Sequence, residues 1–261
     1  MDSKQSNALN LTVGTVPETA LRTALVIGAS GALGAALAEL LSTNANFKNQ
    51  YSHVLRLARQ ASASHTQTID YADESTIAHS ASWVADQCID APLQLIIVAT
   101  GYLHSLTSHG AGPERSFQHL DAQYLQHVML VNAIGPALIL KHFAPLLPKT
   151  GEVRLAFISA KVGSISDNAL GGWYGYRASK AALNQIVKTA AIELARRNKE
   201  TLCIALHPGT VATKLSEPFS KSGLNVRSPM VAAAELLQVI HALEAAQTGG
   251  FYDYTGNTLP W

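Results

Sequence analysis

Ala24-Leu-Val-Ile-Gly28-Ala-Ser-Gly31-Ala-Leu-Gly34 is the stretch that decides the fold of this 261-residue chain. A short apolar run leads directly into an amphipathic helical pattern over residues 32–43. The first glycine permits a tight turn, the second a close approach of a ligand to the backbone, and the third close packing of helix on strand. Backbone N–H groups at such a helix start suit a diphosphate, so the stretch predicts a dinucleotide-binding strand–turn–helix. An ordinary βα turn is the alternative.

Short apolar runs and longer helical patterns alternate along the rest of the chain. The runs expected as strands are 24–28, 54–57, 66–69, 93–99, 153–159, 202–207 and 251–254. The helical patterns cover 32–43, 74–87, 117–147 with a proline break, 174–197 and 229–246. This alternation predicts an α/β fold, a Rossmann-type doubly wound, mostly parallel seven-stranded sheet with helices on both faces. The connection from Leu57 to Thr66 is short for a parallel crossover, so either it lacks a full helix or the expected strand ends are misplaced.

The composition favours a globular protein with a large core. Hydrophobic residues make up 48% of the chain, charged residues 14%, and the formal net charge is +1. Because no basic stripe is present, nothing electrostatic indicates nucleic acid or an anionic membrane. The most apolar stretch noted, 93–99, is shorter than the roughly 20 residues of a membrane span. We expect a polar extension over 1–20, a single domain over 21–261, no metal site, no membrane partner and a cytoplasmic location, with two unpaired thiols at Cys88 and Cys203.

The second expected strand reads Val54-Leu-Arg56-Leu-Ala-Arg59 and should end near the ribose of a bound dinucleotide. A carboxylate there would accept from a 2′-hydroxyl and repel a 2′-phosphate, but this stretch carries two arginines instead. Arginine is a forked, permanently charged donor, so we expect NADP in preference to NAD; solvated arginines are the alternative. Asp70 either accepts from the adenine amino group or caps the helix that starts at Glu74.

Tyr176-Arg-Ala-Ser-Lys180 places a phenol and an ammonium four residues apart, on one face if the segment is helical. An unperturbed phenol has a pKa of about 10, too high for a base near neutrality. A nearby ammonium, together with the positive ring of an oxidised nicotinamide, would favour the phenolate and lower that pKa. In the reducing direction the phenol would donate its proton to the forming alkoxide, so the pair predicts general acid–base chemistry.

Several of these features occur in a fixed order: the glycine turn, Gly101 after the fourth expected strand, an asparagine in the next helix, Tyr176 with Lys180, and Pro208-Gly-Thr-Val-Ala-Thr213. This set resembles the short-chain dehydrogenase/reductase family over Thr23–Trp261. The stretches similar to its C-factor and sniffer-like carbonyl reductase subgroup are Ser159-Ala-Lys-Val-Gly-Ser-Ile, Gly171-Gly-Trp-Tyr-Gly-Tyr176-Arg-Ala-Ser-Lys180 and the ending Pro260-Trp261.

The resemblance implies that Tyr176 is the acid/base and that Lys180 lowers its pKa and binds the nicotinamide ribose. It also implies that Asn132 holds a water in a proton relay to Lys180. Pro136 supports that role, because a proline has no N–H to give to the carbonyl four residues earlier; a simple helix kink at Gly135-Pro136 is the alternative. The other positions expected to contact the cofactor are Gly28, Ser30, Gly31, Leu33, Gly34, Arg59, Asp70, Ala99, Gly101, Pro208, Gly209, Val211 and Thr213.

Two positions depart from the family pattern. Ala160 stands where the family has the serine that hydrogen-bonds the substrate oxygen, which leaves Ser159 or Ser164 to supply a hydroxyl. We expect Ser159, because it ends its strand on the side where open α/β sheets bind ligands. If neither reaches the site, a loss of roughly 10²–10³ in rate is expected by analogy with single-donor deletions. Ala99 stands in place of a common asparagine, which should weaken hydrogen bonding near the sheet centre.

These observations predict an NADP-dependent oxidoreductase that moves hydride between the nicotinamide and a carbonyl or alcohol. The alternative is an NADP(H)-binding signalling or redox-sensing protein with little turnover, as Ala160 and the C-factor resemblance suggest. A hydrolase is disfavoured because no GxSxG turn is present. The stretch 214–228 is expected to form a lid over the substrate or a plain surface loop. The apolar stripes of the 117–147 and 174–197 helices predict a homodimer or homotetramer, or else a larger monomeric core.

Overall fold

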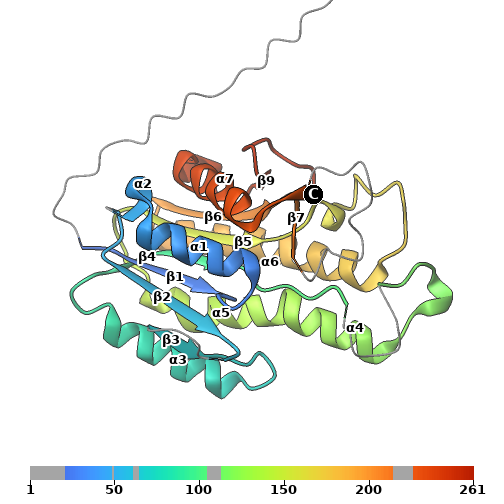
Figure 1. Ribbon diagram of the computed structural model, residues 1–261, viewed down its shortest axis with the longest axis horizontal. Coiled ribbons are helices and arrows are strands. Elements are labelled where there is room, and N and C mark those ends of the chain that lie inside the picture. The colour runs from blue at the N-terminus through green and yellow to red at the C-terminus, as the bar shows by residue number, and fades with distance from the viewer. Residues whose placement is uncertain (1–20, 49, 61–64, 105–112, 214–225) are drawn as a thin grey trace, which may run out of the picture.

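A computed structural model describes residues 21–48, 50–60, 65–104, 113–213 and 226–261. They form a single α/β domain around seven parallel strands in the order β3-β2-β1-β4-β5-β6-β9 (Figure 1). The strands of this sheet are β1 (Thr23–Ile27), β2 (His53–Ala58), β3 (Thr66–Thr68), β4 (Leu93–Val98), β5 (Val153–Ile158), β6 (Thr201–His207) and β9 (Phe251–Asp253). The expected fold class is confirmed, and every expected strand end lies within one residue of the observed one. The expected extension over 1–20 lies outside the described residues.

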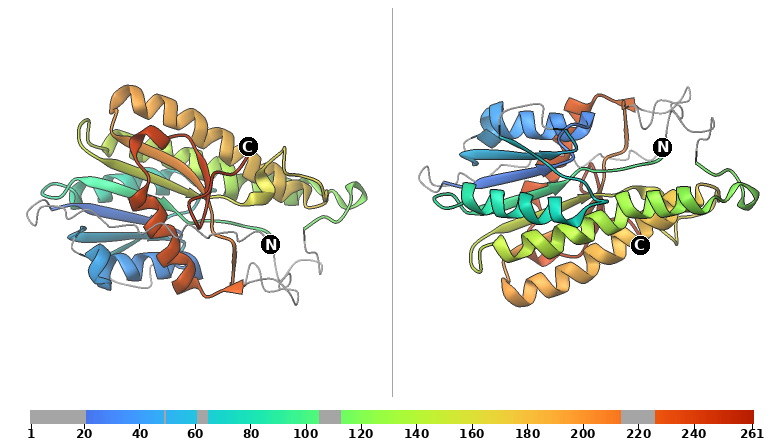
Figure 2. Two further views of the ribbon diagram at one scale, coloured as in Figure 1. Left: turned by 90° about the horizontal axis from the view of Figure 1, so that it is seen from above. Right: turned by 90° about the horizontal axis from the view of Figure 1, so that it is seen from below.

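Helices cover both faces of the sheet (Figures 1 and 2). The helices are α1 (Ala32–Thr43), α2 (Ala45–Lys48), α3 (Glu74–Gln87), α4 (Ala122–Met129), α5 (Gly135–Phe143), α6 (Tyr174–Arg197) and α7 (Pro229–Ala242). Figure 2 shows α1 and α7 on one side of the sheet and α3, α5 and α6 on the other. A two-stranded parallel sheet, β7 (Thr210–Val211) and β8 (Val226–Arg227), lies beyond the end of β6.

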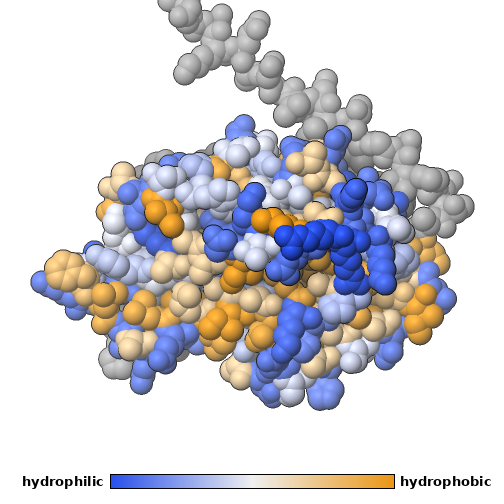
Figure 3. Space-filling model, turned by 180° about the vertical axis from the view of Figure 1, so that it is seen from behind, coloured by the Kyte–Doolittle hydropathy of each residue, from blue (hydrophilic) through white to orange (hydrophobic). Residues whose placement is uncertain are grey.

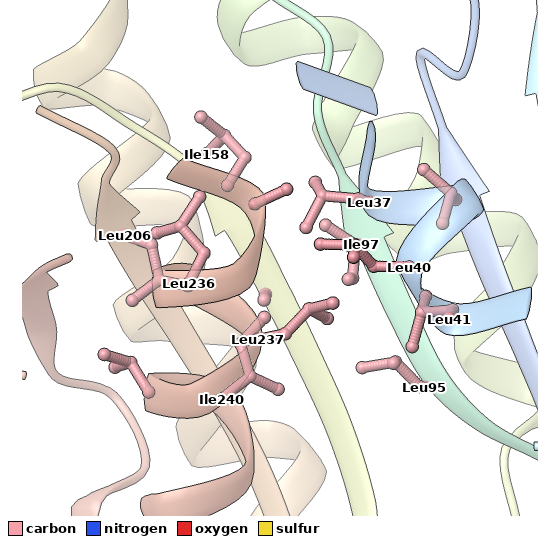
Figure 4. Close-up of a cluster of buried hydrophobic side chains, with 14 of the residues drawn as sticks. Leu37, Leu40, Leu41, Leu95, Ile97, Ile158, Leu206, Leu236, Leu237 and Ile240 are labelled. Carbon is pink, nitrogen blue, oxygen red and sulfur yellow. The ribbon is translucent and has the colours of Figure 1, made fainter. Parts of the chain in front are cut away.

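The core is divided by the sheet into two layers. In one layer, leucines of α1 face leucines of α7 across the side chains of β4, β5 and β6 (Figure 4). In the other layer, α3, α5 and α6 bury residues such as Ile77, Phe143 and Val187 against the same strands. Because both faces are covered, β1 and β4 are apolar and almost wholly buried, as expected for central parallel strands.

The strand order reverses between β1 and β4. From β1 the chain crosses to β2 and β3 on one side, and it later returns to fill β4, β5, β6 and β9 on the other. In open α/β sheets this reversal opens a crevice at the carboxyl ends of the strands. The β2–β3 connection runs over only residues 59–65, and β3 still pairs in parallel with β2. The expected strand ends were therefore right, and this crossover is too short for a full helix.

The long pattern over 117–147 does not form one α-helix. A 3-10 turn over Phe117–His119 precedes α4, and Asp121 caps α4 by accepting from the Tyr124 N–H. Between α4 and α5 lies a π-helical segment, Leu130–Ile134, in which the Gly135 N–H bonds the carbonyl of Leu130, five residues back. This widened turn falls where Pro136 interrupts the ordinary hydrogen-bond pattern. The 229–246 pattern also ends early, at Ala242.

Ala122–Leu146 is a continuous helical segment of 25 residues, long and apolar enough to cross a membrane by length and composition. The expectation based on 93–99 as the most apolar stretch did not take this longer segment into account. Within the fold α4 packs on α6, and α5 packs on α3 and α6. Buried residues such as Val128, Ile139 and Phe143 make this segment in part a core helix.

Candidate active site

The glycine turn joins β1 to α1 at the reversal point. Gly28 has a φ of +87°, and a Cβ there would lie 3.0 Å from backbone atoms of Ala99 and Thr100. A Cβ at Gly34 would collide with the carbonyl oxygen of Gly28. At Gly31, by contrast, φ is −77° and a Cβ would meet only the Gly28 oxygen, at 3.4 Å. The fold therefore requires glycine at 28 and 34, whereas glycine at 31 keeps open the space in front of the α1 amino end.

A cavity of about 280 Å³ extends from this turn toward the ends of β2 and β3. Arg59 and Asp70 both line it, together with Gly28 and Ser30. Asp70 does not cap α3: its carboxylate accepts from the Ala72 N–H, and Asp73 is the capping residue. That alternative for Asp70 was wrong, because the chain makes a further turn before the helix begins.

The two arginines of β2 have different surroundings. Arg56 turns away from the cavity and donates to the Ala38 carbonyl and the Ser42 hydroxyl on α1. Arg59 lies at the cavity mouth, exposed, and makes no hydrogen bond or ion pair with the described residues. Of the two, only Arg59 is placed to meet a phosphate in this cavity.

A second cavity, of about 470 Å³, contains the expected catalytic pair. Tyr176 and Lys180 lie one turn apart on α6, and both face this cavity. The Lys180 Nζ donates to the Ile158 carbonyl at 2.9 Å and lies 5.9 Å from the centre of the Tyr176 ring. The two cavities share Gly31, Ala99, Thr100 and Gly101. The two cavities therefore adjoin, and their lining runs from Arg59 at one end to Tyr176 at the other.

Burial dominates the acid–base properties of this pair. Desolvation raises the pKa of Tyr176 to about 12 and lowers the pKa of Lys180 to about 7. The expectation that the ammonium lowers the phenol pKa is therefore not met by the chain's own residues. A bound positive ring next to the phenol would have to supply much of the opposing shift.

The Asn132 side chain lies behind the cavity, where it binds two segments of the chain, and it does not line the cavity. Its side-chain oxygen accepts from the Tyr102 N–H and its amide donates to the Tyr102 carbonyl, both at 2.8 Å. The same amide donates to Ser179 Oγ at 3.0 Å, and the Ser179 hydroxyl donates to the Tyr176 carbonyl. Asn132 thus joins the loop after β4 to the catalytic helix. Its expected role in holding a water stays a prediction.

Of the two candidate serines, Ser159 and Ser164, only the first lines the cavity. Ser159 lines the cavity, but its hydroxyl donates at 2.6 Å to Asn184 on α6. Ser164 is buried away from the cavity and donates to the Trp261 carbonyl. Ala160 lines the cavity and places a methyl group near Tyr176. A hydroxyl for the substrate oxygen therefore requires Ser159 to turn away from Asn184.

The segment after β6 completes the far wall. All four expected residues of this segment, Pro208, Gly209, Val211 and Thr213, line the larger cavity. Gly209 has a φ of +71°, which an L side chain rarely adopts. Of the expected lid, residues 214–225 lie outside the described part of the chain. No group of three or more His, Cys, Asp or Glu side chains that could hold a metal occurs among the residues described.

Sequence reasoning missed several residues that shape this site. Thr100 lines both cavities and shares a hydrogen bond with the Tyr71 hydroxyl. Asn184 falls one turn after Lys180 on the same helix face, and that spacing was an available signal. Trp173 and His207 also line the larger cavity; Trp173 lies within the 171–180 stretch that carries the family resemblance, whereas nothing in the sequence around His207 distinguishes it.

Comparison with known proteins decides the family. Residues 22–223 match the model of the short chain dehydrogenase family. The chain belongs to this family. C-signal of Myxococcus xanthus is 32% identical over 142 residues, which cover 54% of this chain and 81% of that protein. A 1-hydroxy-2-glutathionyl-2-methyl-3-butene dehydrogenase of Rhodococcus is 33% identical over 142 residues, 54% of this chain but only 61% of that dehydrogenase.

Solved structures of short-chain dehydrogenases share the fold. The carbonyl reductase Sniffer of D. melanogaster has a TM-score of 0.78 at 22% identity, over 92% of this chain and 100% of that one. An NADPH-bound carbonyl reductase from chicken fatty liver has a TM-score of 0.78 at 21% identity, over 96% and 100%. At these identities the structures establish the fold alone. The expected similarity to C-factor relatives is confirmed by C-signal, and Sniffer shares the fold of this chain.

Proposed function

We propose that this short-chain dehydrogenase is NADP-dependent and transfers hydride between the nicotinamide and a carbonyl or alcohol, with Tyr176 as the acid/base. The observation that supports this most directly is the lining of the two adjoining cavities, which runs from Arg59, past the open α1 amino end at Gly31, to Tyr176 and Lys180. A diphosphate fits at Gly31, where the fold leaves the room that a Cβ would fill. A carbonyl reductase with bound NADPH among the neighbours of the same fold is consistent with the proposal.

In the reducing direction a bound NADPH would supply the hydride to the carbonyl carbon. Tyr176 donates its phenolic proton to the carbonyl oxygen as negative charge develops there. Lys180, whose Nζ lies 5.9 Å from the centre of the Tyr176 ring, would stabilise the phenolate that remains. Asn132 fixes the Gly101–Tyr102 loop beside Lys180 and would return the proton through a water on its carbonyl. In the oxidising direction the same groups act in reverse.

Tyr176→Phe tests the reaction class. It keeps the ring and its packing but removes the proton donor, so NADPH oxidation with a panel of aldehydes, ketones and quinones should fall by about 10²–10⁴-fold. Enhancement or quenching of NADPH fluorescence should show unchanged cofactor binding. Turnover by Tyr176→Phe at the wild-type rate would exclude the proposed acid/base.

A second candidate is an NADP(H)-binding signalling or redox-sensing protein with little turnover. Ala160 in place of the oxygen-binding serine favours it, as does the similarity to C-signal. The same experiment separates the two: tight NADPH binding with no Tyr176-dependent oxidation of any carbonyl supports the sensor.

Two further proposals concern the setting of this activity. We expect the protein to act as a homodimer or homotetramer through its helical face, and to act in the cytoplasm. Fractionation of cells that produce the chain checks the second expectation; the first is taken up in the Discussion.

A further inference from the structure

Three side chains of α6 form a stripe that faces the end of β5. Tyr176, Lys180 and Asn184 follow one another at intervals of four residues, so they lie on one face of the helix. The Lys180 Nζ donates to the Ile158 carbonyl at 2.9 Å, and the Asn184 Oδ1 accepts from the Ser159 hydroxyl at 2.6 Å. The helix face that carries the proposed acid/base therefore also holds the partner of the cavity serine.

Burial isolates the Ser159–Asn184 pair from bulk water. Ser159 is 2% exposed and Asn184 is 3% exposed. Ser159 lines the larger cavity, whereas Asn184 lies behind it. A serine hydroxyl has one proton to donate, and here that proton goes to the Asn184 Oδ1. In this arrangement the hydroxyl cannot donate to a carbonyl oxygen in the cavity.

The Asn184 amide has an unpaired end in this orientation. Its Nδ2 is buried and makes no hydrogen bond within the described part of the chain, so two N–H donors lack partners. Such an atom is uncommon in folded proteins and calls for an explanation. A half-turn of the amide exchanges Nδ2 and Oδ1, so that Nδ2 donates to the Ser159 oxygen and the Ser159 proton is released. A carbonyl oxygen bound in the cavity gives that proton an acceptor and so favours the second orientation.

We infer that Asn184 is a positioning residue: through the half-turn of its amide it holds the Ser159 oxygen and directs the Ser159 proton to the carbonyl oxygen of the substrate. The inference rests on the proposed function. It supplies the oxygen-binding hydroxyl one residue before Ala160, so that Ser159 and Tyr176 both donate to the same oxygen. A hydroxyl that accepts a hydrogen bond is also the stronger donor, which favours the charge that develops on this oxygen.

Ser159→Ala, Asn184→Asp and the double variant test this coupling. Each is assayed by NADPH oxidation with benzaldehyde, or with whichever carbonyl of the panel wild type reduces fastest. Ser159→Ala should lower kcat about 10²–10³-fold and change the KM for the carbonyl less than about threefold. The carboxylate introduced by Asn184→Asp claims the Ser159 proton and has no N–H to give, so kcat should fall at least about tenfold. The double variant should lose no more than Ser159→Ala, because Asn184 acts through Ser159.

Asn184→Leu separates positioning from packing. Leucine has the same number of side-chain heavy atoms but neither accepts nor donates, so it leaves the Ser159 proton unclaimed and should keep more activity than Asn184→Asp. A residue needed for packing alone would give the opposite order, because aspartate is the closer match in shape. Ser164→Ala is the matched serine control: Ser164 is also 2% exposed but donates to the Trp261 carbonyl, and its loss should leave kcat unchanged. Thermal melting and NADPH fluorescence check the fold and cofactor binding of every variant.

A wild-type kcat in Ser159→Ala overturns the inference, whatever the Asn184 variants do. It is also overturned if Asn184→Asp turns over at the wild-type rate, if Asn184→Leu loses as much as Asn184→Asp, if the losses add in the double variant, or if neither Asn184 variant folds. In all these cases turnover that still depends on Tyr176 leaves the proposed function standing. If wild type oxidises NADPH with no carbonyl, the proposed function itself fails and the inference falls with it.

Discussion

Lys180 has lost much of its preference for the charged state through burial among Ile158, Gly101 and Tyr176. In the folded protein its pKa is lowered to about 7, whereas an unfolded chain keeps the ordinary value of 10.5. Above pH 7 the unfolded state therefore binds the extra proton, and folding stability rises with pH until the unfolded lysine titrates. The gradient contributed by one such group is at most about 1.4 kcal/mol per pH unit.

We predict that Lys180→Met removes this gradient. Urea unfolding of the nucleotide-free protein at pH 7.0, 7.75 and 8.5 should show a rise in the free energy of unfolding for wild type and a smaller rise for the variant. Burial raises the pKa of the Cys203 and Cys88 thiols, so they oppose the trend near the top of this window, but both proteins carry them and the comparison between the two is unaffected. Parallel curves for the two proteins would mean that Lys180 stays charged in the fold.

Arg59 and Arg56 make a matched pair for the choice of cofactor. Arg59 lines the cavity, where a 2′-phosphate could meet it, whereas the Arg56 guanidinium donates hydrogen bonds to α1. We predict that Arg59→Glu lowers the preference for NADPH over NADH by about 10- to 100-fold. The substitution removes a charge-assisted hydrogen bond and places a carboxylate that repels the 2′-phosphate. Arg56→Gln should leave the ratio of the two kcat/KM values unchanged. An equal effect of both substitutions would locate the 2′-phosphate elsewhere.

At this scale the sequence predicted residue types better than residue contacts. Tyr176, Lys180 and Gly31 were expected from spacings of three or four residues within one element, and all three line the cavities. The hydrogen-bond partners of Ser159 and Arg56 were not predicted, because Asn184 and Ser42 lie on other elements that only folding brings near.

The β1–α1 turn lets the demands of folding be separated from those of ligand binding. A Cβ at residue 34 would collide with the Gly28 carbonyl. We therefore predict that Gly34→Ala lowers the free energy of unfolding by about 1–3 kcal/mol. Gly31→Ala has room for its methyl group, so it should change the free energy of unfolding by less than about 1 kcal/mol. It should nevertheless weaken NADPH binding at least about tenfold, because the methyl group occupies the space in front of the helix start. Denaturation and NADPH fluorescence titration measure the two effects; unimpaired binding by Gly31→Ala would place the diphosphate elsewhere.

Element boundaries were predicted closely where apolar periodicity ended at a capping or glycine residue, as at α1, α3 and α6. In 117–147 the break near the proline was expected, but the π-helical segment was not, because the apolar pattern continues through it. The connection from Leu57 to Thr66 was noted as short for a parallel crossover, and β2 and β3 do pair in parallel across it.

Apolar side chains are exposed on the face of the molecule that carries α4, α5 and α6. Figure 3 shows the face opposite that of Figure 1, and apolar side chains gather across its lower half, where α4 and α5 run. Ile134 in the π-helical segment is 47% exposed, and Ile192 on α6 is 50% exposed. Large exposed apolar areas on soluble domains commonly mark protein interfaces.

We predict that wild type sediments as a dimer or tetramer at micromolar concentration and that Ile134→Asp shifts it to monomer. Ile89, which is 80% exposed at the end of α3, provides the control: Ile89→Asp should not change the sedimentation coefficient. A wild type that stays monomeric over the accessible concentration range would contradict the prediction and leave this face without a partner copy.

The sequence predicted the molecule's plan well, since strand–helix alternation and the ordered motifs specify the sheet and bring both halves of the site to one edge. It could not predict the contacts that form the cavity wall beside Tyr176. Glu114 and Trp173 are 59 positions apart and meet only because a loop after β4 returns to the start of α6. Contacts of that kind leave no local pattern.

The π-helical segment amounts to one extra residue accommodated within a helix. Because the wider turn takes up that residue, α4 and α5 keep nearly the faces that a regular helix one residue shorter would give them. Deleting one residue next to Asn132 should therefore leave both helices packed, and what it would displace is the Asn132 side chain that binds Tyr102.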